Sequence, residues 1–410
     1  MRKPELLVPA SSLEVLKTAV MFGADAVYIG GEAYGLRAKA KNFSMEDMRE
    51  GIRFAHEHGV RVHVTANILA HNNDLAGVEE YFKELRSFGE DAPDALIIAD
   101  PGVFQLAKQI CPDIERHVST QANNTNYATY RFWYEQGAKR VVSARELSLA
   151  EIREIRDRIP EDLEIETFIH GAMCISYSGR CLLSNFFTGR DANQGACTHP
   201  CRWKYAVMEE KRPGEYLPVY ENERGTYIFN SKDLCMIEHI PELIEAGIDS
   251  FKIEGRMKTA LYVATVARTY RKAIDDYLTS PDLYHQNMNW YQEQISNCTY
   301  RQFTTGFFFG KPNEETQIYD NNTYVKEYTY LGIVGDVRED GACRIEQRNK
   351  FSVGETIEIM KPDGQNISAK VLGIENEAGE MQESAPHPKQ SLYVRLDAKP
   401  DTYDILRRAE

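Results

Sequence analysis

The sequence lacks any apolar run long enough to cross a bilayer, and it lacks a positive net charge. Its first residues, Met1 to Pro9, begin with charged side chains, but no long apolar stretch follows, so we predict no signal peptide. We therefore expect a cytoplasmic protein that does not bind membranes. The formal net charge of −14 argues against a generally basic nucleic-acid binder and leaves only a local cluster of Lys and Arg for contacts with RNA.

Several short catalytic motifs are also missing. The sequence has no His-Glu-x-x-His zinc motif and no Gly-x-Ser-x-Gly nucleophile elbow. It has no Cys-x2-Cys pair, the usual element of structural zinc sites. The first predicted strand–helix turn, Pro9 to Ser12, lacks the Gly-x-Gly-x-x-Gly phosphate loop of open dinucleotide-binding sheets. These absences weaken the protease, zinc and dinucleotide-binding hypotheses.

The first 255 residues repeat a short β-branched run followed by a longer segment of helical period. Such runs are typical of parallel strands buried on both faces. Eight of them, with helical segments between, predict an α/β fold of the (β/α)8 TIM-barrel type rather than an open doubly wound sheet. The predicted strands are Glu5–Ala10, Ala26–Gly30, Arg61–Ala66, Ala95–Ala99, Glu115–Thr120, Arg140–Ala144, Glu164–Ile169 and Ser250–Glu254.

One interval between strands, from Ile169 to Ser250, is far longer than the others. We predict a helix from Ser231 to Ala246, which leaves 171–225 as a Cys-rich insertion after the seventh strand. The active sites of such barrels lie at the C-terminal ends of the strands, so the insertion is expected on the catalytic side. The predicted domains are the barrel with its insertion, an irregular linker and a small C-terminal β-barrel, at 1–280, 281–320 and 321–410.

Four of the eight cysteines lie inside this insertion, with the spacing Cys-x6-Cys-x15-Cys-x3-Cys. In a reducing cytosol, clustered cysteines more often bind metal or react than form disulfides. Four thiolates suit zinc or an iron–sulfur cluster, and the spacing alone leaves the type open. Cys235 is a fifth candidate, on the helix expected after the insertion, whereas Cys111, Cys298 and Cys343 have apolar or strand contexts and are predicted to be core residues.

Polar residues that follow the predicted strands are expected to line the barrel mouth. We assign proton transfer to His170, which titrates near neutral pH, and a catalytic role to Glu254. Arg256 is a candidate clamp for carboxylates, because a guanidinium binds them through two parallel hydrogen bonds. In the alternative, Glu254 pairs with Arg256 and His170 only orients the cysteine loop. The full substrate-binding set is Asn67, Gln121, Arg145 and Arg256.

Several motifs resemble the collagenase-like peptidase family of unknown catalytic type. They are His170-Gly-Ala-Met-Cys174, Tyr177-Ser-Gly-Arg-Cys181, Cys197-x3-Cys201-Arg-Trp and Lys252-Ile-Glu-Gly-Arg256. The resemblance covers essentially the whole chain and is closest to the branch that makes 5-hydroxyuridine at the wobble position of tRNA. It implies an enzyme with a 4Fe-4S cluster that uses no molecular oxygen and depends on prephenate. It also implies tRNA as partner, with a paralogous family member as a further candidate.

Matched residue by residue, the resemblance implies that the metal ligands are Cys174, Cys181, Cys197 and Cys201. Relatives that hydroxylate the ubiquinone ring take their fourth cysteine from further downstream, at a distance close to that of Cys235. Cys235 is therefore the rival of Cys201 for the fourth position.

A splayed tRNA base would stack on aromatic or Arg faces. Six aromatic residues are available, and most of them are expected to pack the insertion: Tyr34, Tyr177, Phe186, Phe187, Trp203 and Tyr205. Two other functions remain as alternatives. One is a peptidase, with Cys174 and His170 as a thiol–imidazole pair, and the other is a non-enzymatic, zinc-stapled barrel that binds RNA or a protein.

Overall fold

The computed structural model describes residues 2–32, 34, 42–174, 176–203, 206–208, 216–218, 232–298, 302–310 and 328–410. The predicted insertion, linker and C-terminal domain therefore each lie partly outside the described residues. The chain divides into two compact units. The first holds Met1–Val20, Ala24–Lys258 and Arg301–Thr323, and the second holds Met21–Gly23, Thr259–Tyr300 and Tyr324–Glu410.

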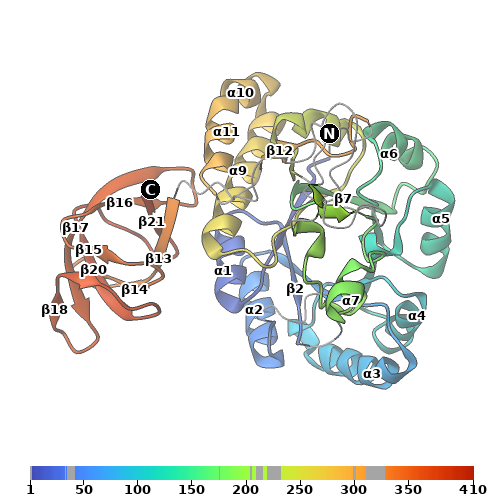
Figure 1. Ribbon diagram of the computed structural model, residues 1–410, viewed down its shortest axis with the longest axis horizontal. Helices are drawn as coiled ribbons and strands as arrows, with labels where there is room; N and C mark the ends of the chain where they lie inside the picture. The colour runs from blue at the N-terminus through green and yellow to red at the C-terminus, as the bar shows by residue number, and fades with distance from the viewer. Residues whose placement is uncertain are drawn as a thin grey trace. The chain divides into compact units, whose positions relative to one another are not determined.

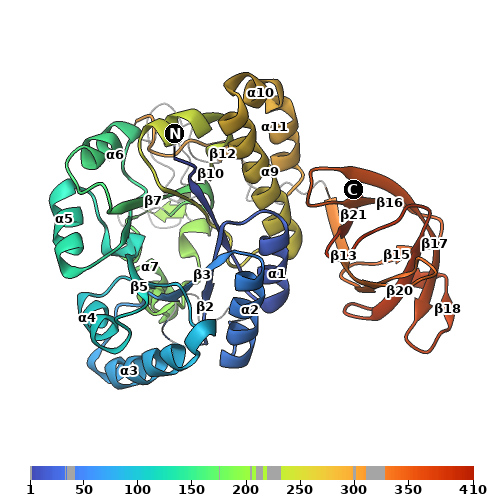
Figure 2. The same cartoon turned by 180° about the vertical axis from the view of Figure 1, so that it is seen from behind.

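Eight parallel strands form the closed barrel of the first unit (Figures 1 and 2). Each strand pairs with the next in sequence, and the last one pairs with both the seventh and the first, which closes the ring. The (β/α)8 prediction is confirmed. The strands are β1 Glu5–Pro9, β2 Ala26–Gly30, β3 Arg61–Ala66, β4 Ala95–Ile98, β5 Glu115–Val118, β6 Arg140–Val142, β7 Glu164–Gly171 and β11 Ser250–Ile253.

Helices surround the strands and bury their apolar faces against the outside of the barrel (Figures 1 and 2). They are α1 Leu13–Met21, α2 Met45–Glu57, α3 Asn72–Ser87, α4 Pro101–Ile110, α5 Tyr127–Gln136, α6 Leu149–Arg156 and the short α8 Ile240–Glu245. Within the described ranges, every helix is too short or too polar to span a membrane.

The chain between β7 and α8 differs from the predicted helix at 231–246. Asp233–Cys235 form a strand, β10, which pairs antiparallel with the end of β7, and β12 (Phe303–Thr304) pairs parallel with β10. A 3-10 turn at Ile237–His239 follows, and α8 begins only at Ile240. Cys235 therefore lies on a strand beside His170 and not on a helix, which corrects its predicted setting.

The second unit contains a closed antiparallel barrel of six strands. They are β13 Tyr328–Val337, β14 Cys343–Glu346, β16 Thr356–Met360, β17 Asn366–Asn376, β20 Ser391–Leu396 and β21 Ile405–Ala409. The order β16-β21-β13-β14-β20-β17 returns to β16, and the apolar residues of these strands fill the interior. The expected C-terminal β-barrel is thus confirmed.

Three helices also belong to the second unit: α9 Ala260–Thr279, α10 Pro281–Gln286 and α11 Met288–Ser296. The sequence predicted an irregular linker here, so that prediction is wrong for 281–296. The two short helices α10 and α11 bury Tyr284, Tyr291, Gln294 and Ile295. Only Ile295 of these is aliphatic, which is why no apolar helical stripe is visible there in the sequence.

Candidate functional site

The cysteine-bearing insertion leaves the barrel at the C-terminal end of β7, where Gly171 adopts a φ of +107°. A Cβ atom at this position would lie 2.4 Å from the carbonyl oxygen of Glu254, directly after β11. The Glu254 amide also donates to the His170 carbonyl at 2.8 Å. Only glycine combines this left-handed backbone with so close an approach. The insertion therefore starts at a tightly fixed point.

Arg145, which follows β6, holds the next residue of the insertion. Its Nη1 donates to the Ala172 carbonyl at 2.7 Å, and its Nη2 lies 3.4 Å from Oε2 of Glu254. The guanidinium carbon lies 3.9 Å from the centroid of the Phe168 ring, a cation–π contact. Arg145 was predicted to bind substrate, and the structure shows it anchoring the chain two residues before Cys174.

A small pocket opens beside this anchor, with room for about one water molecule. Its lining includes Arg145, Thr167, Phe168, Met173 and Leu234. The Nε of Arg145 and the Oγ1 of Thr167 are buried and make no hydrogen bond to the described residues. Buried polar groups usually have a partner, so these two atoms are candidates for hydrogen bonds to water in the pocket.

Two further contacts carry the insertion across the mouth. A Cβ at Gly179 would lie 3.5 Å from the Cβ of Gln121, which follows β5. Gln194 Nε2 donates to the Leu69 carbonyl, after β3, at 2.6 Å. In Figure 1, α7 (Leu183–Thr188) lies in front of the strands, inside the ring of outer helices. The insertion is thus tethered to the loops after β6, β5 and β3.

The remaining predicted site residues fall into two groups. Ser119 joins Asn67 and Gln121, since its Oγ lies 3.5 Å from Asn67 Nδ2 and accepts from the Gln121 amide at 3.3 Å. Arg256 is 5% exposed, and its Nη1 donates to Oγ1 of Thr65, on β3, at 3.0 Å. These three predicted binding residues therefore lie toward β3 and β5, while Arg145, His170 and Glu254 lie toward β6, β7 and β11.

His170 is 1% exposed, and its ring centroid lies 5.7 Å from that of Phe303. Burial lowers the pKa of His170 to about 3, with nearby Lys258 acting in the same direction and Asp233 opposing it. The imidazole is therefore neutral at pH 7. It can donate a single N–H there, but it is a poor acceptor of protons.

The four predicted ligands lie on the insertion, and none of them forms a disulfide. Cys174 and Cys197 are exposed, whereas Cys181, Cys201 and their rival Cys235 are half-buried. Accessible, unbridged thiols are the donors that an iron–sulfur cluster or zinc requires, so the donor chemistry fits. Among the residues that the structure describes, however, no three His, Cys, Asp or Glu side chains are gathered as metal ligands.

The other three cysteines are buried, as predicted. Burial raises the pKa of Cys111 to about 11 and that of Cys343 to about 12. The thiols of Cys111 and Cys343 are therefore protonated and unreactive at neutral pH.

Sequence reasoning missed a column of charge inside the barrel. Arg140, 2% exposed, donates to Glu5, Glu164 and Glu166. Lys252 donates to the other oxygen of Glu166 at 2.6 Å, and its Nζ lies 5.3 Å from the Phe168 centroid. The Arg145 guanidinium also contacts the Phe168 ring, so the column of charge extends to the residue that anchors the insertion. Charged residues inside otherwise apolar strands were the signal that could have revealed it.

Comparisons with known proteins place these features in a wider context. A sequence profile described as Peptidase family U32 matches residues 11–318, and one described as Peptidase family U32 C-terminal domain matches residues 326–407. The tRNA hydroxylation protein P1 of Bacillus subtilis is 42% identical over 410 residues, covering 100% of this chain and 96% of that protein.

Two other relatives differ in their names. The tRNA hydroxylation protein P of Escherichia coli is 39% identical over 434 residues, covering 96% of this chain and 94% of that protein. A protein of Methanocaldococcus jannaschii named as an uncharacterized protease is 40% identical over 364 residues, covering 87% of this chain and 86% of its own length.

Proposed function

This chain belongs to peptidase family U32, and from this membership and the names of its relatives we propose that it converts the wobble uridine of tRNA to 5-hydroxyuridine without molecular oxygen. The observation that carries the proposal is the cysteine-bearing insertion. It is fixed at Gly171 and Arg145 and crosses the barrel mouth to the loops after β5 and β3. The mouth is where barrels of this type carry their active sites.

We propose a 4Fe-4S cluster held by Cys174, Cys181, Cys197 and Cys201. When bound, such a cluster would supply the electron transfer that amino-acid side chains cannot perform. The half-buried Cys235 lies opposite His170 in the β7–β10 pairing and remains the rival for the fourth position.

Hydroxylation replaces the C5–H bond of the base by C5–OH and removes two electrons from it. The reaction therefore needs a source of the oxygen atom and an acceptor for the two electrons. We propose prephenate as the co-substrate, as the family resemblance implies. Arg256 is the candidate for its carboxylates, because a largely buried guanidinium at the mouth binds an anion more strongly than an exposed one. Asn67 and Gln121, which share Ser119, would present their amides to the uracil edge.

The two residues predicted to be catalytic from the sequence, Glu254 and His170, have different settings. Glu254 is the candidate to accept a proton, with its carboxylate positioned by Arg145. Neutral His170 is instead a candidate positioning residue, because its carbonyl accepts from the Glu254 amide where the insertion begins.

The test is the nucleoside composition of tRNA, measured by mass spectrometry in a strain that lacks this gene and every paralogous pathway. We expect wobble 5-hydroxyuridine to disappear, to return with the wild-type gene and not to return with Cys174→Ser. Cys298→Ala, at a buried cysteine outside the insertion, is the matched control that should restore it. Unchanged 5-hydroxyuridine in the deletion strain would refute the proposal.

Iron and sulfide analysis of the anaerobically purified protein tests the cofactor separately. We expect Cys201→Ser to lose iron and Cys235→Ser to retain it, and the reverse would make Cys235 the fourth ligand. Zinc without iron would favour the zinc-stapled barrel. Collagen cleavage that persists in Cys174→Ala and in chelators would favour a peptidase of another type.

A further inference from the structure

Three aromatic side chains of the insertion lie on the surface instead of packing it. Phe186 is 80% exposed, Phe187 46% and Trp203 45%. The Phe187 ring centroid lies 5.3 Å from that of Phe186 and 6.0 Å from that of Trp203. We call these three residues the aromatic platform. A contiguous exposed aromatic surface is costly in water and usually marks a binding site.

The expectation that the aromatic residues pack the insertion is therefore wrong for these three and for Tyr177, which is 46% exposed. Tyr34 is half-buried, with its ring centroid 5.7 Å from that of Tyr81, which lies on α3 and not on the insertion. Tyr205 lies outside the described residues.

A cluster of hydroxyl groups connects the segments that carry the platform. The Ser184 hydroxyl is 3.0 Å from that of Thr198 and accepts from the Thr198 amide at 3.0 Å. The Thr188 hydroxyl donates to the Ser184 carbonyl at 2.7 Å and lies 3.2 Å from the Thr198 hydroxyl. This cluster joins α7, which carries Phe186 and Phe187, to the segment that leads to Trp203. These partly buried hydrogen bonds therefore hold the two segments that carry the three rings next to each other.

The part of the insertion that carries the platform is basic, although the whole insertion, 171–225, is nearly neutral, with seven Lys and Arg against six Asp and Glu. Residues 172–205 contain Arg180, Arg190, Arg202 and Lys204 against the single acid Asp191, whereas the chain carries a net charge of −14. Arg180 and Arg190 are exposed. Aromatic rings interleaved with arginines are the combination that binds single-stranded nucleic acid, since rings stack on bases and arginines meet phosphates.

We propose that the aromatic platform stacks unpaired bases of the tRNA loop that carries the target uridine, with Arg180 and Arg190 facing its phosphates. This inference rests on the proposed function and adds to it the surface that receives the RNA. The insertion crosses the barrel mouth, where Gly179 packs against Gln121 and Gln194 donates to the Leu69 carbonyl. Bases stacked there would flank the nucleotide that enters the mouth.

Binding of a fluorescent 17-nucleotide anticodon stem-loop RNA to the full chain, followed by anisotropy, tests the platform. Stacking of a base on an aromatic ring contributes about 1–3 kcal/mol to the binding free energy. We therefore expect Phe186→Ala and Trp203→Ala each to raise the Kd for the stem-loop about 5- to 100-fold. Binding of a duplex with the stem sequence alone should change less than about twofold. Phe186→Trp, which keeps a ring, should restore tight binding of the stem-loop.

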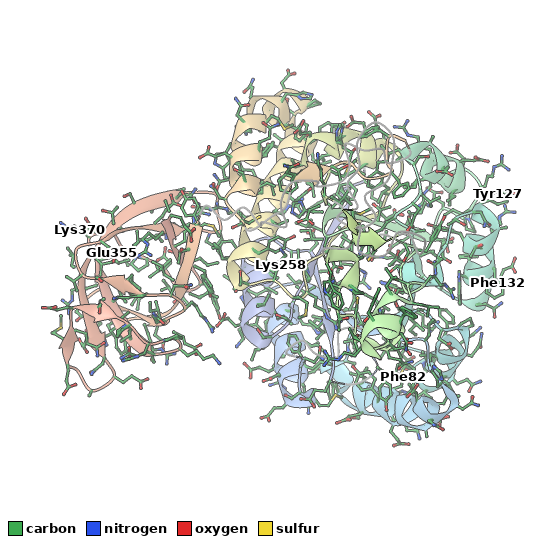
Figure 3. All side chains as sticks on the ribbon, viewed as in Figure 1. Phe82, Tyr127, Phe132, Lys258, Glu355 and Lys370 are labelled. Atoms are coloured by element: carbon green, nitrogen blue, oxygen red, sulfur yellow. The ribbon has the colours of Figure 1, made fainter. Side chains whose placement is uncertain are left out.

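The matched control is Phe132→Ala. Phe132 is 49% exposed, but it lies on α5, on the outer wall of the barrel (Figure 3). We expect this variant to bind both RNAs like the wild type. Equal losses in the control and platform variants would overturn the proposal, because they would show a general effect of removing exposed rings.

Two other results would also overturn it. One is wild-type affinity for the stem-loop in both platform variants. The other is a loss of self-association in Phe186→Ala without an effect on RNA, which would make the platform an interface between protein chains. The proposed function fails separately, through unchanged 5-hydroxyuridine in the deletion strain. If 5-hydroxyuridine disappears from the deletion strain but the platform variants bind RNA like the wild type, the proposed function stands and only the RNA-binding role of the platform is refuted.

Discussion

Gly171 determines how the chain leaves β7 and enters the insertion. Its φ of +107° and the 2.4 Å approach of the Glu254 carbonyl to the Cβ position together exclude a side chain. Arg145 then fixes Ala172, so two residues set the direction of the segment that carries the cysteines. Strand-end placement was readable from sequence, but the partner of the Arg145 guanidinium was not, because that depends on how β6, β7 and β11 meet in space.

We predict that Gly171→Ala lowers the free energy of unfolding by at least about 1 kcal/mol and exposes the insertion to proteases, because alanine is strained at positive φ and its Cβ collides with Glu254. Urea unfolding and limited proteolysis would measure both effects. Gly189→Ala is the matched control, since Gly189 has a φ of +66° but no atom within 4 Å of its Cβ position. Gly189→Ala places alanine at positive φ without a collision of its Cβ. Equal effects of the two variants would therefore show that the collision with Glu254 is not what destabilises Gly171→Ala.

At the scale of the strands, the inward positions of β3 and β5 place two buried histidines together. The rings of His63 and His117 are both 0% exposed and meet edge to face, with centroids 4.8 Å apart. Burial lowers the pKa of both histidines well below the usual range, and nearby Arg140 acts in the same direction on each, while Glu5 opposes it. Both rings are therefore neutral in the folded barrel.

Since the unfolded histidines take up protons below pH about 6.5 and the folded ones do not, we predict that the protein loses stability as the pH falls below that value. The loss is about 1.4 kcal/mol per pH unit for each histidine, and stability is unaffected by these groups above about pH 7. Urea unfolding between pH 7.5 and 5 would measure it. His63→Phe should remove one histidine's share of the slope, whereas His387→Gln, at an exposed position, should not. A slope unchanged by His63→Phe would rule out this explanation.

The elements differ in how far the sequence could predict them. The ends of all eight barrel strands were predicted to within two residues, because a β-branched run bounded by polar or turn-forming residues is a strong local signal. Strand β10 has only three residues, too few to show alternation, and its pairing with β7 is a tertiary contact. Exposure of Phe186 contradicts the general tendency of aromatic residues to be buried, so only the structure could reveal it.

At the scale of the whole molecule, helices α9 to α11 are grouped with the C-terminal barrel. One buried side chain of α9 links α11 to the C-terminal barrel. Arg268 is 2% exposed, and its Nη1 donates to the Lys361 carbonyl at 2.8 Å and to Oδ1 of Asn366 at 3.0 Å. Its Nη2 donates to Oε1 of Gln294, on α11, at 2.7 Å. Burial lowers the pKa of Arg268 to about 9, so the side chain is still charged at pH 7.

We predict that Arg268→Met destabilises this unit by about 3 kcal/mol, because it removes the hydrogen bonds that the guanidinium donates to Lys361, Gln365, Asn366 and Gln294. Hydrogen exchange of the β16 and β17 amides, read by mass spectrometry, would locate the effect in the second unit. Arg395→Met is the matched control, because Arg395 and its partner Asp340 are 48% and 45% exposed and such pairs contribute about 0–1 kcal/mol. Faster exchange in the control but not in Arg268→Met would show that the helices are not held to the barrel by this guanidinium.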